Sequence, residues 1–185
     1  RRMGIFGLGA TGLAMAQRAN GFDIEVYAID RPDRFEEKRR QVKTLGVKLV
    51  ADQDSLIEVC DILSFHVPAT DQTRNMVNAN FLSKLAPGTI IINTSRGDLI
   101  DEPALIEAMD KKDIFVGLDV YRHEPGTAQG EFDSVLARHP NVYGTHHIGA
   151  STMQAQIAVA AGVLEVIDAF TSGHIINCVN PSTGQ

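Results

Sequence analysis

Three short segments carry side chains suited to acid–base and carboxylate chemistry. They are Ser95-Arg96-Gly97, His123-Glu124-Pro125 and Thr145-His146-His147-Ile148-Gly149, each after an apolar run that predicts a buried strand. A glycine-rich turn, Gly7-Leu8-Gly9-Ala10-Thr11-Gly12, precedes them. An arginine, a carboxylate and a histidine beside a dinucleotide site are the groups needed to move a hydride onto or off a carbon that bears a hydroxyl.

Side-chain chemistry gives each group a candidate role. The Arg96 guanidinium can hold a substrate carboxylate through two parallel hydrogen bonds and polarise the adjacent carbonyl. The His147 imidazole, with an ordinary pKa of about 6.5, can accept the hydroxyl proton near neutral pH. Glu124 on its other nitrogen would fix the tautomer and stabilise the imidazolium. Each residue also has a structural alternative, as a surface arginine, a turn glutamate or a buried histidine, and for His147 alone that alternative is favoured, so the hypothesis depends on their joint occurrence.

The glycine-rich turn follows an apolar strand and opens a helix, which is the context of a dinucleotide-binding turn. Gly7 allows the tight turn, Gly9 lets the backbone approach a pyrophosphate, and Gly12 allows the helix to lie close to the strand. The first helical residues, Ala10 and Thr11, then offer unpaired N–H groups to the phosphates.

An acidic residue, Asp30, ends the next predicted strand, 30 − 12 = 18 residues after Gly12. A carboxylate there accepts hydrogen bonds from ribose hydroxyls and repels a 2′-phosphate, which favours NAD over NADP. Arg31 and Arg34 weaken this inference, because an arginine beside the ribose can admit the extra phosphate. The structural alternative is a turn aspartate before Pro32.

Composition favours one acidic globular domain. The chain has 185 residues, 44% of them hydrophobic, and 17 Lys+Arg against 23 Asp+Glu, which argues against a nucleic-acid surface. Cys60 and Cys178 lack metal-ligand spacing and predict buried, reduced thiols and a cytoplasmic location. We expect no metal and no membrane span, since the longest apolar run, residues 157–164, is too short.

Apolar β-branched runs alternate with helical patterns, which predicts a doubly wound, mostly parallel α/β sheet. The predicted strands cover residues 3–6, 24–29, 47–50, 62–65, 89–93, 115–118 and 141–143. The predicted helices cover 10–20, 34–45, 54–59, 78–84, 103–111 and 151–172. Pro103 suits a first helical turn, and Ser151 is the expected cap of the last helix. With no evident internal boundary, we expect one dinucleotide-binding domain over residues 1–185.

Several motifs occur in a fixed order. They are the glycine-rich turn, Ser64-Phe65-His66-Val67-Pro68-Ala69-Thr70, Asn93-Thr94-Ser95-Arg96-Gly97, Leu118-Asp119-Val120 with Glu124-Pro125, and His147-Ile148-Gly149. Together they resemble the cofactor domain of the D-isomer-specific 2-hydroxyacid dehydrogenases, from Met3 to about Pro181. This resemblance implies a Rossmann-like NAD-binding domain with Arg96, Glu124 and His147 as catalytic residues.

The resemblance also implies cofactor contacts. Asp119 would meet the nicotinamide carboxamide, and the His66-Val67-Pro68 loop would lie near the ribose and adenine. The remaining cofactor contacts expected from it are Thr94, Ser95 and Gly149. His146 stands where the family commonly has proline, so His146 facing the cleft is the alternative to His147.

The same resemblance sets expectations for the whole protein. It implies a small 2-hydroxy or 2-oxo acid substrate and a homodimer, and it leaves the substrate domain outside this chain, so the fragment alone should turn over poorly. The residues around Gly149-Ala150-Ser151-Thr152 most resemble phosphoglycerate-oxidising members, which predicts 3-phosphoglycerate and serine biosynthesis. Another 2-hydroxy acid, or an NAD-sensing corepressor-like module that keeps the catalytic set, is the alternative. A methyltransferase would leave Arg96, Glu124 and His147 unexplained.

Overall fold

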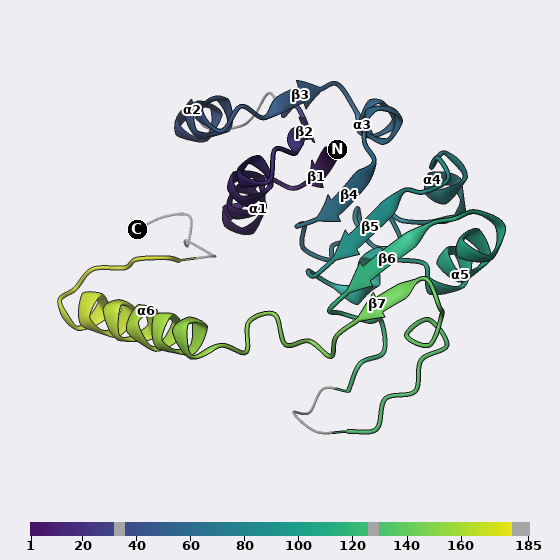
Figure 1. Ribbon diagram of the computed structural model, residues 1–185. Coiled ribbons are helices and arrows are strands. Elements are labelled where there is room, and N and C mark those ends of the chain that lie inside the picture. The colour runs from purple at the N-terminus through teal and green to yellow at the C-terminus, as the bar shows by residue number, and fades with distance from the viewer. Residues whose placement is uncertain (32–35, 126–129, 179–185) are drawn as a thin grey trace. The chain divides into compact units, whose positions relative to one another are not determined.

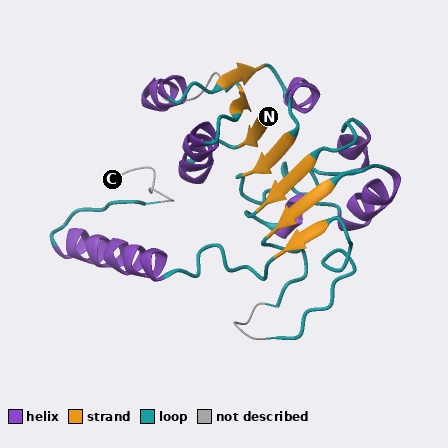
Figure 2. Cartoon of the chain, in the orientation of Figure 1, coloured by secondary structure: helices purple, strands orange, loops and turns teal. Residues whose placement is uncertain are grey.

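The computed structural model describes residues 1–31, 36–125 and 130–178, which divide into two compact units, residues 1–146 and 147–185. Unit 1 contains a parallel sheet of seven strands in the order β3-β2-β1-β4-β5-β6-β7 (Figures 1 and 2). The strand order reverses between β1 and β4, as in doubly wound dinucleotide-binding sheets. The predicted parallel α/β architecture is therefore confirmed, while the prediction of one domain over 1–185 stays a prediction.

The elements of unit 1 fall within one or two residues of the predicted ranges wherever the structure describes them. The strands are β1 (Arg2–Phe6), β2 (Glu25–Ile29), β3 (Lys48–Val50), β4 (Ile62–Phe65), β5 (Ile90–Asn93), β6 (Phe115–Leu118) and β7 (Val142–Gly144). The helices are α1 (Ala10–Gly21), α2 (Glu36–Thr44), α3 (Gln53–Val59), α4 (Ala79–Ser83) and α5 (Glu102–Lys111), with a short 3₁₀ helix η1 (Gly97–Leu99) that the sequence did not predict. Residues 34–35 of the second predicted helix lie outside the described residues.

Two apolar cores lie on opposite faces of the sheet, because successive strand side chains alternate between faces. On one face, Met3 and Ile5 of β1 meet Ala16 of α1 and Val42 of α2. On the other face, side chains of β4, β5 and β6 pack against α3, α4 and α5. Large buried side chains of this core include Phe65, Leu63 and Ile91 from the strands and Phe81 and Leu105 from the helices. Burying each such side chain stabilises the fold by about 1.5–3 kcal/mol, so the two cores fix the sheet and its loops.

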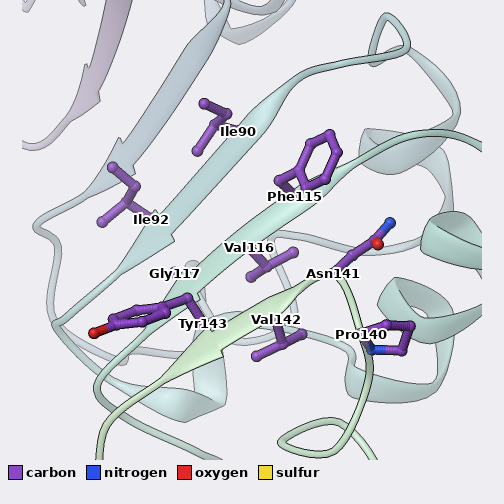
Figure 3. A pocket seen from close by; sticks show the side chains of 9 residues that line it. All are labelled: Ile90, Ile92, Phe115, Val116, Gly117, Pro140, Asn141, Val142 and Tyr143. Carbon is purple, nitrogen blue, oxygen red and sulfur yellow. The ribbon is translucent and has the colours of Figure 1, made fainter.

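The first face is less completely covered over β5, β6 and β7. Figure 3 shows Ile90, Ile92, Phe115 and Tyr143 along this hollow. Phe115 is 48% exposed and Tyr143 is 81% exposed. Unit 1 alone therefore leaves an apolar surface here.

Unit 2 contains α6 (Met153–Thr171). The Thr152 hydroxyl accepts a hydrogen bond from the Ala155 N–H at 3.2 Å and caps the helix, so the prediction of Ser151 as the cap was wrong by one residue. Both residues carry a hydroxyl, and only the backbone conformation, extended at Thr152, decides between them.

Helix α6 is also long and apolar enough, by length and composition, to cross a membrane, with a mean hydropathy of 1.4. The expectation that no segment approaches such a span is wrong on this measure. That expectation counted only the unbroken apolar run between Gln156 and Glu165, whereas the helix continues with further apolar residues beyond these polar positions. One such helix is weak evidence for a membrane, since an apolar helix from the core of a soluble protein passes the same test.

Candidate functional site

The predicted site residues of unit 1 follow strands that end in register. Phe6 pairs with Phe65, Phe65 with Asn93, Asn93 with Leu118, and Leu118 with Gly144. Gly7, His66, Thr94, Asp119 and Thr145 are the next residues along the five strands. The carboxyl edge of the sheet, where doubly wound folds bind ligands, therefore collects the predicted loops of this unit.

The glycine-rich turn has the predicted conformation. Gly7 has φ +94°, and a Cβ on Gly12 would collide with the Gly7 carbonyl oxygen, so both the tight turn and the close helix require glycine. Gly9 is exposed, and a Cβ there would meet no atom within 4 Å, which leaves open space in front of the turn.

The start of α1 differs from the starts of α3, α4, α5 and α6. It has no side-chain cap and no acidic residue in its first turn. By contrast, α3, α4, α5 and α6 are capped by Asp52, Asn78, Asp101 and Thr152. Uncapped N–H groups at Ala10 and Thr11 beside open space fit the phosphates of a dinucleotide.

Asp30 lies directly after β2 and is exposed. Its N–H donates to the carbonyl of Val50 on β3 at 2.8 Å, which anchors the backbone while leaving the carboxylate at the sheet edge. Arg31 beside it is exposed, and Arg34 lies outside the described residues.

The backbone of the loop after β4 packs closely against the glycine-rich turn, because a Cβ on Gly7 would stand only 2.6 Å from the His66 carbonyl oxygen. The His66 Nε2 lies 2.9 Å from the hydroxyl of fully buried Ser64. Burial lowers the pKa of His66, which favours a neutral imidazole. In the same loop, the Thr73 hydroxyl donates to the Pro68 carbonyl at 2.6 Å. Ser64 thus anchors the His66 ring, and Thr73 fixes the backbone two residues further along the loop.

Asn93, whose role could not be expected from its sequence context, shapes the arginine loop. Its side-chain amide donates to the Arg96 carbonyl at 2.9 Å, and its Oδ1 accepts from the Ser95 N–H at 3.1 Å and the Ser95 hydroxyl at 2.8 Å. Asn93 is fully buried, so these bonds fix the backbone under Arg96. The Arg96 side chain is exposed, and its Nη1 donates to the Ser95 carbonyl at 2.6 Å.

The carboxylates after β6 differ in burial. Asp119 is buried, and the Thr145 hydroxyl donates to its Oδ1 at 2.5 Å. Glu124 is half-buried, and its Oε2 accepts from the Tyr121 N–H at 3.4 Å. Burial, followed by the nearby charges of Glu102 and Asp119, raises the pKa of Tyr121. The sequence gives no signal for the bond between Thr145 and Asp119, because that bond requires β6 and β7 to end side by side.

Arg96 and Glu124 belong to unit 1, whereas His147 and Gly149 belong to unit 2. His147 is exposed and has φ +57°, the left-handed region that residues other than glycine seldom adopt. Backbone of this kind concentrates at functional sites. His146, the alternative, is exposed as well and ends unit 1.

Other histidine and cysteine side chains lie in different surroundings. His139 Nδ1 accepts from the Asn141 N–H, and its Nε2 lies 3.3 Å from the carboxylate of Asp110. Cys60 is buried as predicted, but Cys178 is exposed, so the expectation of two buried thiols was wrong for Cys178. Across residues 1–31, 36–125 and 130–178, no cluster of three His, Cys, Asp or Glu side chains is placed to hold a metal ion.

Comparison with known proteins agrees with this geometry. Residues 1–149 match the family described as D-isomer specific 2-hydroxyacid dehydrogenase, NAD binding domain. The chain is 37% identical over 174 residues to D-3-phosphoglycerate dehydrogenase of Bacillus subtilis, covering 94% of this chain and 31% of the relative. It is 36% identical over 184 residues to glyoxylate/hydroxypyruvate reductase B of Enterobacter agglomerans, covering 98% and 54%.

Among solved structures, D-lactate dehydrogenase with NAD+ from Lactobacillus jensenii superposes with a TM-score of 0.81 at 27% identity, covering all of this chain and 56% of that chain. The chain thus spans about a third to just over half of the length of these relatives. The family match identifies the cofactor as NAD, and the uncapped helix start and the open glycine turn fit the phosphates of such a dinucleotide. This chain belongs to the NAD-binding domain family of the D-isomer-specific 2-hydroxyacid dehydrogenases.

Proposed function

We propose that the protein carrying this chain transfers a hydride between NAD and a D-2-hydroxy acid. The observation that supports this most is the arrangement at the carboxyl edge of the sheet. There the Asn93-fixed loop presents Arg96, and the loop after β6 presents Glu124. A cationic fork and a carboxylate on neighbouring strand ends suit an acid substrate whose oxygen exchanges a proton.

The proposed roles follow from the chemistry of oxidation. When bound, NAD would supply the acceptor for the hydride that leaves C2 of the hydroxy acid. Arg96 binds the substrate carboxylate and stabilises the forming carbonyl oxygen. His147 accepts the hydroxyl proton, and Glu124 holds the imidazole in the required tautomer and stabilises its charged form. In the reverse direction, His147 returns the proton to the oxygen of the 2-oxo acid.

Other residues are proposed to hold the cofactor. The N–H groups at the start of α1 would bind the pyrophosphate, and Asp30 would bind the adenosine ribose. Buried Asp119, fixed by Thr145, would meet the nicotinamide carboxamide. The His66-Val67-Pro68 loop would line the ribose and adenine side, and Thr94, Ser95 and Gly149 complete the proposed set.

For the substrate, we propose 3-phosphoglycerate first, and hydroxypyruvate or glyoxylate second. The relative named D-3-phosphoglycerate dehydrogenase and the relative named glyoxylate/hydroxypyruvate reductase B match at similar identity, 37% and 36%. A homodimer and a cytoplasmic location belong to the same proposal.

The test is an NADH-oxidation assay on the full-length protein with phosphohydroxypyruvate, hydroxypyruvate, glyoxylate and pyruvate. We expect turnover of at least one acid, with the highest kcat/KM for phosphohydroxypyruvate. Tight NADH binding without turnover of any acid would contradict the dehydrogenase proposal and favour a cofactor-sensing module. A higher kcat/KM for hydroxypyruvate or glyoxylate would contradict only the substrate assignment.

A further inference from the structure

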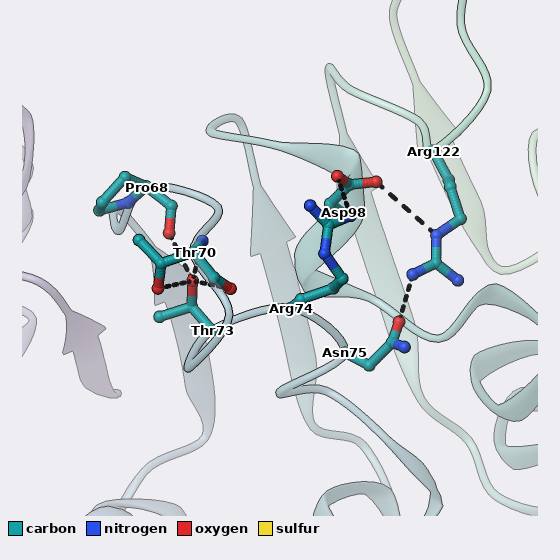
Figure 4. A network of polar contacts seen from close by, with 7 residues as sticks. All are labelled: Pro68, Thr70, Thr73, Arg74, Asn75, Asp98 and Arg122. Atoms are coloured by element: carbon teal, nitrogen blue, oxygen red, sulfur yellow. Dashed lines mark hydrogen bonds and ion pairs between the residues drawn. The ribbon is translucent and has the colours of Figure 1, made fainter.

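Asp98, beside the proposed site, lies between two arginines from distant parts of the chain (Figure 4). Its Oδ2 accepts from the Arg74 Nη1 at 2.5 Å, and its Oδ1 lies 3.7 Å from the Arg122 Nε. Arg122 also donates from Nη2 to the Asn75 Oδ1 at 2.5 Å. One carboxylate therefore connects three loops: those after β4, β5 and β6.

Asp98 and Arg122 each lie close in sequence to one of the proposed catalytic groups. Asp98 lies two residues after Arg96, and Arg122 lies two residues before Glu124. Between them the backbones touch, because a Cβ on Gly97 would collide with the Tyr121 carbonyl and stand 2.5 Å from the Arg122 nitrogen. The ion pair thus spans the point of closest approach of the two loops.

The third loop is attached to the same carboxylate residue by its backbone. The Asn75 N–H donates to the Asp98 carbonyl at 2.9 Å, and the Val77 N–H donates to the Leu99 carbonyl at 3.0 Å. Asn75 has φ +52°, a conformation that asparagine tolerates better than most residues. The loop that begins at His66 is therefore tied to η1, and through Asp98 to Arg122.

The simpler explanation is an exposed ion pair, which contributes only about 0–1 kcal/mol to stability. Three observations separate this group from such a pair. The Arg122 side chain is only 23% exposed, and the Asp98 carboxylate is shared by two guanidinium groups. In addition, the backbone N–H of Arg122 donates to the Glu102 carboxylate on α5 at 2.9 Å. Networks of this kind fix geometry even where their contribution to stability is small.

We propose that Asp98 is a positioning residue that sets the spacing between the Arg96 loop and the Glu124 loop by holding Arg122 and Arg74. Its kinetic consequence rests on the proposed function, because the spacing matters for turnover only if Arg96 and Glu124 act on one substrate. Its structural consequence, that loss of the carboxylate charge loosens both loops together, does not depend on any activity.

The test compares three variants of the full-length protein. Asp98→Asn keeps the side-chain size and removes the charge, and Asp98→Glu restores the charge on a longer stem. Asp54→Asn is the matched control, because it removes a carboxylate from the exposed Lys84–Asp54 pair that ties α3 to α4. Hydrogen exchange is followed in peptides covering residues 95–101 and 121–125, and thermal unfolding is measured alongside.

For Asp98→Asn we expect faster exchange in both peptides, partial recovery in Asp98→Glu, and no change in either peptide for Asp54→Asn. Unchanged exchange in the 121–125 peptide of Asp98→Asn would overturn the proposal, whether or not the protein has dehydrogenase activity. The proposal would also be overturned if Asp54→Asn increased hydrogen exchange in both peptides as much as Asp98→Asn does, since the effect would then be general destabilisation.

The kinetic arm separates positioning from stability. If the proposed function holds, Asp98→Asn should lower kcat/KM for the 2-oxo acid by roughly 10-fold to 100-fold, as expected for a misplacement near 1 Å. The KM for the acid should rise while the Kd for NADH changes less than about twofold, because the α1 turn is untouched. A lower unfolding temperature with unchanged KM and kcat would overturn the positioning role.

Discussion

Replacing Gly97 with alanine tests the backbone contact between the two loops that carry Arg96 and Glu124. The added methyl would stand 2.5 Å from the Arg122 nitrogen and closer still to the Tyr121 carbonyl. Ordinary contacts require about 3.5 Å or more, and the closest carbonyl atom would lie 2.1 Å from the methyl, so the loops must separate by roughly 1.4 Å. Since the obstacle is backbone, no rotation of a side chain can relieve it.

The expected cost follows from this geometry. Overpacking of a well-filled site costs about 1–3 kcal/mol, and we expect the upper end because Gly97 is buried and only backbone movement makes room. A displacement of about 1 Å between groups that act on one substrate lowers kcat/KM by roughly 100-fold. Gly97→Ala should therefore lose both stability and turnover.

The assay is urea unfolding of the full-length protein together with steady-state kinetics. Gly21→Ala is the matched control, because a Cβ on this α1 residue would meet no atom within 4 Å. Alanine in a helix is favoured over glycine by about 0.5–1 kcal/mol, so the control should be as stable as the wild type or slightly more stable. Wild-type stability and turnover in Gly97→Ala would refute the close contact between the two loops.

Three further predictions concern single side chains. His147→Ala should lower turnover by about 10²–10⁴-fold with little change in NADH affinity, and normal turnover would reject its acid–base role. Asp30→Ala should weaken NADH binding more than NADPH binding in titrations, and equal changes would remove Asp30 from the ribose site. Burial raises the pKa of Cys60 to about 12, so an alkylating reagent at neutral pH should modify exposed Cys178 and spare Cys60. Mass spectrometry of the labelled, folded protein checks this, and rapid labelling of Cys60 would contradict its burial.

Much of the fold was predictable because its signals are local. The strands of a doubly wound sheet are short apolar runs, and the start of α5 combines a capping aspartate, Asp101, with Pro103 in the first turn. Where two local signals compete, the sequence is insufficient. Ser151 and Thr152 are both able to cap α6, and the exposure of Cys178 depends on packing that its neighbours in sequence do not reveal.

The candidate site also combines features that local sequence predicts with features that depend on packing. Residues that follow parallel strands share an edge of the sheet, so Gly7, His66, Arg96 and Asp119 could be grouped from the strand pattern alone. The groups that hold these loops could not be predicted, because a contact such as Gly97 against Tyr121, or Thr145 against Asp119, depends on how far each loop extends after its strand.

Two close backbone contacts therefore set the distances between the loops of the proposed site. Gly7 brings the dinucleotide turn against the loop of His66, and Gly97 brings the loop of Arg96 against Arg122. In both places a missing side chain lets main chain meet main chain, which is stiffer than contact through rotatable side chains. Buried Asn93 and the Asp98 network then fix what the glycines allow. A substitution at either glycine should consequently lower turnover more than one at exposed Gly21, where a Cβ would meet no atom within 4 Å, although neither Gly7 nor Gly97 offers a functional group to a substrate.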